Sequence, residues 1–450
     1  MCGYYFSNIS QLDHTDNLKR RGPDSWNETE IQDLGHFGCA RLTTMGEVTE
    51  QPVVTKWQNN TKGVLLYNGS CYNKEITGND TQWISDQLSD QNYSDFVPWI
   101  RDLEGEYSLV WATPNQIFFG TDIFGMRPLY YYYDERGVSI ASLADCIKSK
   151  HKVFYRCQPN LIYIYDNNSK QLKTFINKEF DLKQTVNNYD RVWELWEKAV
   201  KDRYTDQASI LMSSGYDSGM IACTANKSHN DLDCYYVYNE QEQQEIIERR
   251  QQVHNIKVID LNAESLSNDY YNNREHPFHQ ELLDMCPDVE ILKTNTYCNA
   301  GDSEIYQNNM IPKGKRIILG GDGGDDIYSD YGYKGERMRK QSRFGGHFPG
   351  DLDTVWPWTS NNVFQTYHNR TEIVGGYHGI EYRCPFMSTE LIQAWLNTTH
   401  ELKNKKYKGW MAQYMLDHNY PYADMEEHGG AIKMGYWHAS DRTEKEKIND

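Results

Sequence analysis

The chain opens Met1-Cys2-Gly3, and this stretch sets the expectation for its first half because it places a thiol beside the N-terminus. We expect Met1 to be removed, since the small side chain of Cys2 favours removal. Cys2 would then carry its own base, because a free α-amine with a pKa of about 7.7–8.0 can take the thiol proton. The sequence therefore predicts Cys2 as a nucleophile with an N-terminal amine as its general base.

Residues suited to an amide substrate follow Cys2 along the chain. Attack on an amide carbon builds negative charge on its oxygen, and Asn68-Gly69, predicted as a turn, offers a side-chain amide and a backbone N–H to that charge. Arg41 offers a cation for the carboxylate of an amino-acid substrate, and Asp80 offers an anion for its ammonium group. Together these residues predict a pocket that hydrolyses an amino-acid amide.

Short apolar runs between turn residues predict strands throughout the first half. They lie at residues 63–67, 107–112, 116–120, 129–133, 138–141 and 161–165. Residues 134–137 predict a hairpin turn, and residues 81–88 carry the best helical pattern, so we expect an antiparallel two-sheet domain with few helices. The polar stretch 178–188 lacks an apolar period. We place the boundary there, which gives domains 2–182 and 183–450.

The composition excludes several classes of partner. A chain of 450 residues is too long for one core, and its formal net charge of −18 argues against nucleic acid and anionic membrane as partners. The ten cysteines form no Cys-x-x-Cys pair, which argues against a structural zinc site. No apolar stretch approaches the roughly 20 residues of a membrane span. We therefore expect a cytoplasmic protein with reduced thiols.

An apolar stripe predicts a helix just after the boundary. The stripe consists of Val192, Leu195, Trp196, Ala199 and Val200 at helical spacing. Short apolar runs then alternate with helical ones such as residues 240–253, which predicts a parallel α/β sheet with ligands at the carboxyl ends of its strands. The predicted strands are 209–212, 235–238, 257–259 and 316–319.

Two strand ends carry loops suited to a nucleotide. The first is Ser213-Ser214-Gly215-Tyr216-Asp217-Ser218, whose small residues let backbone N–H groups and hydroxyls close on a phosphate at a helix N-terminus. The second is Gly320-Gly321-Asp322-Gly323-Gly324-Asp325-Asp326, where three carboxylates are crowded on a glycine-rich loop. Crowded carboxylates favour a cation, and Asp217 adds another to the first loop. The two loops together predict ATP bound with Mg²⁺.

Motifs in the first half resemble the glutamine amidotransferase domain of glutamine-hydrolysing asparagine synthetases. The matching stretches are Cys2-Gly3, Arg21-Gly22-Pro23-Asp24, Ala40-Arg41-Leu42, Asn68-Gly69, Gly78-x-Asp80, Gly105-x-Tyr107 and Asp122-x-Phe124-Gly125-x-x-Pro128-Leu129-Tyr130. The resemblance implies an N-terminal-nucleophile hydrolase sandwich (αββα) in which Cys2 attacks glutamine. It assigns Arg41 to the glutamine carboxylate, Asn68 and Gly69 to the oxyanion, and Asp80 to the ammonium. The family usually has Glu after Asn-Gly, where this chain has Ser70.

The second half is similar to the ATP-pyrophosphatase-type synthetase domain of the same family. The loop at 213–218 resembles its pyrophosphate loop, with Ser214 in place of a Gly, and Glu381-Tyr382-Arg383-Cys384-Pro385-Phe386 resembles a further motif. By this resemblance Gly321 belongs to the ATP site, and Asp217 and Asp325 are the Mg²⁺ ligands. Asp322 replaces the carboxylate that assists amide formation, and Lys433 is the candidate for a lysine that stabilises charge on the adenylate and pyrophosphate.

We therefore expect an ATP-dependent, glutamine-hydrolysing amidotransferase. The acceptor carboxylate would attack ATP to give an acyl-adenylate, and ammonia released at Cys2 would displace AMP. Aspartate is the leading acceptor, although the expected acceptor segment 292–297 matches no family pattern. His276-Pro277-Phe278-His279 lies nearby, and a structural role is the favoured interpretation. Relatives suggest a homodimer, by analogy alone.

Three alternatives stay open at this point. In the first, the enzyme amidates a carboxylate other than aspartate, such as that of a cofactor, nucleobase or peptide. In the second, the chain is an adenylating ligase of the β-lactam-synthetase or lasso-peptide-cyclase type. Such ligases need no glutaminase, so an intact Cys2 pocket argues against them. The third alternative is a non-catalytic scaffold that binds glutamine or nucleotide, because Ser70, Ser214 and Asp322 depart from the family pattern.

Overall fold

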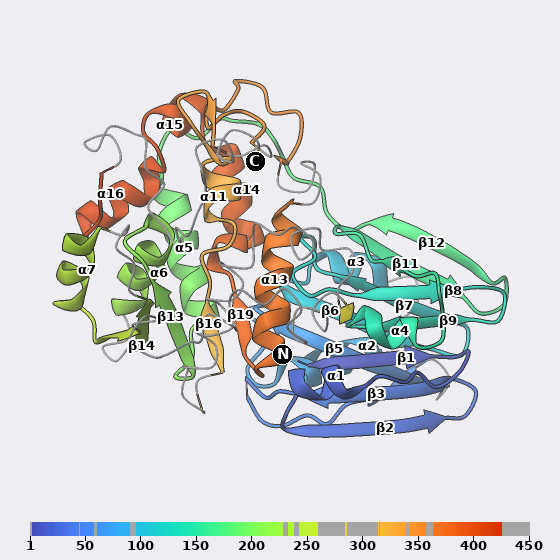
Figure 1. Ribbon diagram of the computed structural model, residues 1–450. Helices are drawn as coiled ribbons and strands as arrows, with labels where there is room; N and C mark the ends of the chain where they lie inside the picture. Colours follow the sequence, from blue (N-terminus) through green and yellow to red (C-terminus); the bar gives the residue numbers. More distant parts are fainter. Residues whose placement is uncertain are drawn as a thin grey trace. The chain divides into compact units, whose positions relative to one another are not determined.

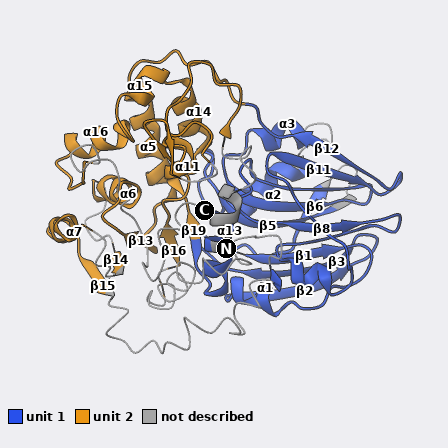
Figure 2. Ribbon diagram, turned by 45° about the horizontal axis from the view of Figure 1, so that its top comes forward, with its two compact units in different colours: residues 1–179, 275–294, 367–381 blue, residues 180–274, 295–366, 382–450 orange. Residues whose placement is uncertain are grey.

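Two compact units make up the chain in the computed structural model, and Figure 2 colours them blue and orange. Unit 1 comprises residues 1–179, 275–294 and 367–381, and unit 2 comprises residues 180–274, 295–366 and 382–450. The structure describes residues 2–44, 46–57, 61–90, 96–227, 233–237, 243–259, 284–285, 314, 316–338, 342–356 and 363–424. The predicted boundary between residues 182 and 183 stays a prediction.

Unit 1 is built on two six-stranded antiparallel sheets (Figure 1). The first has the order β10-β8-β9-β1-β3-β2, with strands Tyr155–Arg156, Tyr130–Tyr133, Val138–Ala141, Gly3–Ser7, Gly35–Arg41 and Ser25–Ile31. The second has the order β12-β11-β7-β6-β5-β4, with strands Gln171–Ile176, Leu161–Asp166, Gln116–Thr121, Gly105–Ala112, Thr61–Cys71 and Val53–Trp57. The predicted antiparallel two-sheet arrangement is confirmed.

Alternating side chains build the layers of unit 1. One face of β5 contributes Val64 and Leu66 to a buried cluster that also contains Tyr4, Phe6 and side chains of the first sheet, so the two sheets pack face to face. The other face contributes Leu65 and Tyr67 to a second cluster. That cluster contains side chains of α2 (Asp80–Asp90) and α3 (Phe96–Arg101), while α1 (Asp16–Arg21) and α4 (Ala144–Lys148) pack on the first sheet. The expected αββα layering follows.

Unit 2 contains a five-stranded sheet with the order β15-β14-β13-β16-β19. Its strands are Ile256–Ile259, Asp233–Val237, Ala208–Met212, Ile317–Leu319 and Glu381–Arg383. The pairings β13–β14, β13–β16 and β14–β15 are parallel, which confirms the predicted parallel sheet. β13, the middle strand, is therefore followed by a loop at the carboxyl edge, where parallel sheets bind ligands.

Helices surround the sheet of unit 2. They are α5 (Asp190–Arg203), α6 (Tyr216–Asn226), α7 (Gln244–Gln251), α11 (Gly324–Tyr328), α14 (Thr389–Asn397), α15 (His400–Asn404) and α16 (Gly409–Asp417). The predicted stripe of α5 is buried, and its Trp196 ring packs 4.4 Å from the ring of Phe386. Among the described residues, no helix combines the length and the apolar character that a membrane crossing requires.

Candidate active site

Cys2 directly precedes β1 and is almost completely buried, with 7% of its surface exposed. Gly3 pairs with Ala40 of β3, which places Cys2 beside Arg41 in the same sheet. The backbone nitrogen of Cys2 donates a hydrogen bond to Oδ1 of Asn68 at 2.7 Å. That nitrogen is the atom that would become the free α-amine after removal of Met1. The structure therefore brings the predicted nucleophile, its base and Asn68 together.

Asn68 and Gly69 lie inside β5, so their prediction as a turn was wrong. Asn68 pairs with Ser108 and Gly69 pairs with Tyr107 across the strand pair β5–β6. Gly69 has a φ of +137°, and a Cβ there would overlap the carbonyl oxygen of Glu106. Glycine adopts this positive φ readily because it has no Cβ, and β5 therefore stays paired with β6 at this position.

The side-chain amide of Asn68 retains a spare donor. Its Oδ1 is occupied by the Cys2 nitrogen, whereas its buried Nδ2 has no hydrogen-bond partner among the described residues. A buried donor without a partner costs about 1–3 kcal/mol, so its retention beside a thiol calls for a function. The amide group is suited to bind an oxyanion formed on a substrate at Cys2.

Arg41 and Asp80 are both engaged with neighbouring groups. Nη1 of Arg41 contacts Oε1 of Glu50 at 2.5 Å, and 13% of the Arg41 side chain is exposed, compared with 60% of the Glu50 side chain. Asp80 accepts hydrogen bonds from the backbone N–H of Cys71 at 3.0 Å and of Thr81 at 2.8 Å. Asp80 therefore connects α2 to β5. The carboxylate that pairs with Arg41 belongs to the exposed side chain of Glu50.

A carboxylate stands beside Ser70, the position where the family usually has Glu. The hydroxyl of Ser70 donates to Oε1 of Glu381 at 2.7 Å, and the hydroxyl of Thr44 donates to Oε2 at 3.2 Å. Glu381 is completely buried, and 311 positions separate it from Ser70. It is the last residue of the unit 1 segment 367–381 and also the first residue of β19, whose other residues belong to unit 2. The negative charge missing at position 70 is therefore present in the same neighbourhood on a different residue.

In unit 2, the first predicted loop joins β13 to α6 and is closed by its own hydroxyls. Ser218 Oγ accepts from the Ser213 backbone N–H at 3.1 Å, and Ser213 Oγ accepts from that of Gly215 at 3.2 Å. Ser214 Oγ accepts from the Gln243 backbone N–H at 3.4 Å. The ring of Tyr216 lies 6.0 Å from that of Tyr407. These bonds hold a compact turn at the N-terminus of α6.

Asp217 and Asp325, the two predicted metal ligands, converge on the same cation. Nζ of Lys408 lies 2.5 Å from Oδ1 of Asp217 and 2.7 Å from Oδ1 of Asp325. Although burial acts to lower it, the pKa of Lys408 is raised because both carboxylates stabilise its charge. Gly321 and Gly324 make room for this arrangement, since a Cβ at residue 324 would overlap the carboxylate of Asp217.

The position of Lys408 tests whether these residues fit Mg²⁺. Two carboxylate oxygens from separate loops meet at the Nζ atom, and carboxylate oxygens are ligands that Mg²⁺ prefers. Asp217 and Asp325 would therefore hold Mg²⁺, with further oxygens supplied by phosphate and water. The described residues thus fit the expected ion.

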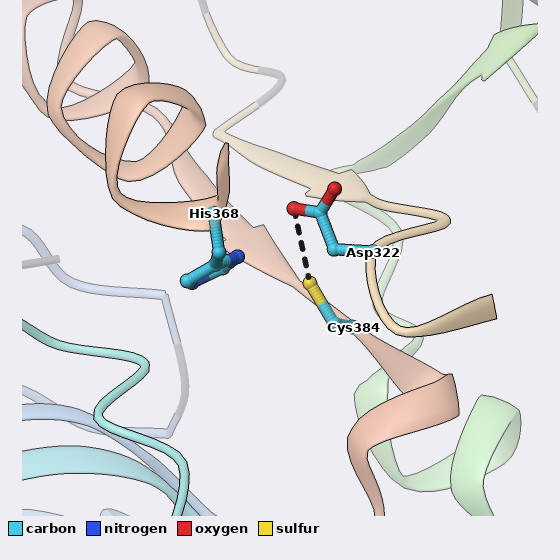
Figure 3. A group of neighbouring side chains, drawn as sticks. All are labelled: Asp322, His368 and Cys384. Atoms are coloured by element: carbon cyan, nitrogen blue, oxygen red, sulfur yellow. Dashed lines mark hydrogen bonds between the residues drawn. The ribbon is translucent and has the colours of Figure 1, made fainter. Parts of the chain in front are cut away.

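Asp322 lies in the second loop beside a thiol. Sγ of Cys384 donates to Oδ2 of Asp322 at 3.9 Å, and Figure 3 shows the two side chains pointing toward each other. His368, also labelled there, belongs to unit 1, where its Nε2 binds the carbonyl oxygen of Met126 at 3.0 Å. Lys433, the expected acceptor segment 292–297 and the pair His276 and His279 lie outside the described residues.

Comparison with known proteins shows which domain family part of the chain resembles. The family model described as "Glutamine amidotransferase domain" matches residues 6–185. Over residues 6–185 the chain is therefore similar to this domain family. The match begins after Cys2, so the choice of nucleophile rests on the hydrogen bond between Cys2 and Asn68.

Relatives that match from 30% to 86% of the chain carry asparagine synthetase names. The human asparagine synthetase domain-containing protein 1 is 31% identical over 144 residues, which are 30% of this chain and 22% of that protein. A probable glutamine-hydrolysing asparagine synthetase of Acanthamoeba polyphaga mimivirus is 22% identical over 86% of this chain and 75% of its own length. A probable glutamine-hydrolysing asparagine synthetase of Schizosaccharomyces pombe is 25% identical over 86% of this chain and 72% of its own length. The predicted resemblance to glutamine-hydrolysing asparagine synthetases is confirmed.

A solved structure offers a weaker comparison. The glutamine phosphoribosylpyrophosphate amidotransferase of B. subtilis is 12% identical over 57% of this chain and 65% of its own, with a TM-score of 0.33. A score at that level does not define a shared fold.

Gln51 is a residue of unit 1 beside Cys2 that sequence reasoning missed. It is buried, and its side-chain amide pairs with both backbone groups of Tyr67, accepting from N at 2.7 Å and donating to O at 3.0 Å. The same Nε2 lies 3.9 Å from Sγ of Cys2. Gln51 therefore fixes the strand position immediately before Asn68 and places a donor near the thiol.

Arg21 and Arg127 form a buried ion cluster in the same unit. Arg21 Nε donates to the Cys2 carbonyl oxygen at 3.3 Å, and its Nη2 lies 2.6 Å from Oε1 of Glu372. Arg127 Nη1 lies 2.7 Å from the other oxygen of Glu372. Burial opposes the charge of Arg127, but the surrounding carboxylates raise its pKa. The cluster fixes the backbone of Cys2 through its carbonyl oxygen.

The buried thiol of Cys39, a neighbour of Cys2, supplies a first prediction. A hydrogen bond from the Cys39 thiol lowers the pKa of Cys2 to about 7, against the opposing effect of burial, while the pKa of Cys39 is raised. In Cys39→Ala this donor is lost, so we expect the pKa of Cys2 to rise to about 8.5 or above. The measurement is the pH dependence of Cys2 alkylation by iodoacetamide, read by mass spectrometry.

The wild-type alkylation rate should rise with pH and reach half of its maximum at about pH 7, because only the thiolate reacts. Cys146→Ala, which removes another buried thiol of unit 1, should leave that profile unchanged. Identical midpoints in Cys39→Ala and the wild type would show that Cys39 does not control the thiol.

Proposed function

We propose that the chain is a glutamine-dependent amidotransferase that uses ATP to amidate a carboxylate through an acyl-adenylate, with aspartate as the leading acceptor. The observation that carries the proposal is the hydrogen bond between the Cys2 nitrogen and Asn68, whose Nδ2 has no partner within the described part of the chain. It supports an N-terminal-nucleophile mechanism for unit 1. The convergence of Asp217 and Asp325 on one cation supports nucleotide chemistry in unit 2.

The glutaminase step begins at the Cys2 sulfur. The α-amine takes the thiol proton, and Sγ attacks the side-chain amide carbon of glutamine. The charge that forms on the amide oxygen is received by Asn68 Nδ2 and the Gly69 N–H. Collapse of the intermediate transfers the proton to the leaving nitrogen, releases ammonia and leaves a thioester on Cys2, and water then hydrolyses the thioester to glutamate. Arg41 and Asp80 bind the α-carboxylate and α-ammonium groups.

The synthetase step activates a carboxylate that is otherwise a poor acyl donor. An oxygen of the acceptor attacks the α-phosphorus of ATP, and pyrophosphate leaves. The loop 213–218 and Gly321 bind the phosphates, while Lys408 balances the charge of Asp217 and Asp325. Mg²⁺, when bound, neutralises the charge that develops on the leaving pyrophosphate. Ammonia then attacks the acyl carbon, AMP leaves, and Asp322 and Lys433 are the proposed groups that assist this step.

The reaction products test the proposal. Purified protein with glutamine, aspartate and Mg·ATP should form glutamate, asparagine, AMP and pyrophosphate. A parallel screen supplies ammonia directly, varies the carboxylate and measures pyrophosphate release. It therefore reports the activity of unit 2 independently of unit 1. If pyrophosphate is released with another carboxylate and not with aspartate, that carboxylate is the acceptor. Folded protein that yields neither glutamate from glutamine nor pyrophosphate from any acceptor would sink the proposal.

Glu50 supplies a second prediction, because its carboxylate occupies the proposed anchor for the glutamine carboxylate. Glu50→Gln removes that competing charge from Arg41, so we expect a lower KM for glutamine. Exposed ion pairs contribute about 0.2–1 kcal/mol, which corresponds to a decrease of up to about fivefold. Steady-state release of glutamate measures the change.

Glu47→Gln is the matched control, since this neighbouring side chain is exposed and its carbonyl, not its carboxylate, binds Asn79. It should leave KM unchanged. A raised KM in Glu50→Gln would mean that Glu50 orients Arg41 for the substrate and does not compete with it.

A further inference from the structure

Arg250, on α7, reaches beneath the loop that joins β13 to α6. Its side chain is completely buried, and Nη1 donates to the carbonyl oxygen of Ser213 while Nη2 donates to that of Gly215 at 3.2 Å. Nε donates to the carbonyl oxygen of Pro421 at 3.0 Å. A single buried guanidinium therefore donates hydrogen bonds to three backbone carbonyls, and two of these carbonyls belong to the loop.

Gly219 makes room for this guanidinium. It lies in the first turn of α6, and a Cβ at this position would overlap Nη2 and the central carbon of Arg250. Glycine in a helix costs about 1 kcal/mol relative to alanine, so a specific steric reason accounts for it here. Gly219 and Arg250 thus act as a pair, since the missing side chain of one creates the space that the other fills.

The pair determines how the loop presents its backbone. Carbonyl oxygens that face a phosphate repel it, whereas N–H groups and a buried positive charge attract it. Because the guanidinium fork holds the carbonyls of Ser213 and Gly215, those two peptide groups have a fixed orientation. The loop hydroxyls of Ser213 and Ser218 are also fixed, by their bond of 2.9 Å.

We propose that Arg250 is a positioning residue for nucleotide binding: it holds the loop 213–218 in the conformation that accepts the polyphosphate of a nucleoside triphosphate, and Gly219 is required for its placement. This inference rests on the proposed use of that loop by ATP. Arg250 acts through the loop carbonyls and does not itself contact the nucleotide.

The test compares Arg250→Met and Arg250→Lys with the control Arg249→Met, whose exposed side chain neighbours Arg250 on the same helix. Equilibrium dialysis with Mg·ATP gives Kd, and pyrophosphate release with added ammonia gives KM and kcat. We expect Kd and KM to rise by about tenfold or more in Arg250→Met, since charged hydrogen bonds are lost. Arg250→Lys should recover part of the affinity, and Arg249→Met should match the wild type.

A purely structural role would lower the melting temperature but leave the Kd of the folded protein unchanged, and that result overturns the inference. If Arg250→Met does not fold, Gly219→Ala carries the same comparison, because it retains the arginine and displaces its guanidinium; unchanged affinity there also overturns it. Wild-type protein that binds Mg·ATP without releasing pyrophosphate contradicts the proposed reaction, whereas the Kd comparison still decides the role of Arg250. Wild-type protein that does not bind Mg·ATP contradicts both.

Discussion

Replacing Cys2 with alanine is expected to lower glutamine-dependent product formation by about 10⁴-fold or more while leaving ammonia-dependent formation intact. The thiol is the atom that attacks glutamine, and nothing else at this position forms the thioester. Unit 2 should be unaffected, because ammonia added at high pH replaces the product of unit 1. Paired assays with glutamine or an ammonium salt, each followed by pyrophosphate release and amide formation, measure the difference.

Two controls make this result specific to the thiol of Cys2. Cys146→Ala removes a buried thiol from α4 of the same unit and should retain both activities. Far-ultraviolet circular dichroism of Cys2→Ala should match the wild type. If Cys2→Ala loses ammonia-dependent activity as well while remaining folded, the division of labour between the two units is wrong. If it retains glutamine-dependent activity, another residue is the nucleophile.

The strands of both units could be predicted because their local patterns agree with their tertiary environment. The run at 129–133 forms β8, and the run at 209–212 forms β13, since apolar side chains in short runs are buried by neighbouring strands. The prediction for Asn68-Gly69 was wrong because this dipeptide usually forms turns. Here the pairing of β5 with β6 continues through the positive φ of Gly69, which only long-range contacts decide.

Predictability of the site depends on distance along the chain. Asp217 and Asp325 each follow a strand of one parallel sheet, and the carboxyl ends of such strands share an edge, so the sequence pattern alone predicts that the two side chains lie close together. Lys408 carries no such signal. It lies 191 positions from Asp217, and a lone lysine before a helix is ordinarily a solvent-exposed residue. Arg250 is likewise hidden within a charged helix, because its burial depends on Gly219.

Lys408→Met is expected to destabilise unit 2 and to make its stability depend strongly on Mg²⁺. The side chain of Lys408 is nearly inaccessible to solvent, and its Nζ lies within 2.7 Å of an oxygen of both Asp217 and Asp325. Removing the cation leaves two neighbouring carboxylates facing one another, and the loss of one partner from a buried ion pair costs about 3–5 kcal/mol. Pyrophosphate release should fall by about 100-fold or more, since the charge balance of the phosphate site is lost.

The stability measurement separates this explanation from a simple loss of packing. Methionine nearly preserves the length of the lysine side chain, so a packing defect would lower the melting temperature equally with and without Mg²⁺. Charge repulsion instead predicts that Mg²⁺ restores much of the lost stability in the variant and adds less to the wild type, where Nζ already neutralises the carboxylates. Lys405→Met, an exposed neighbour, is the control and should show neither effect. Equal Mg²⁺ responses in Lys408→Met and the wild type would place the metal elsewhere and would remove Asp217 and Asp325 from the proposed coordination.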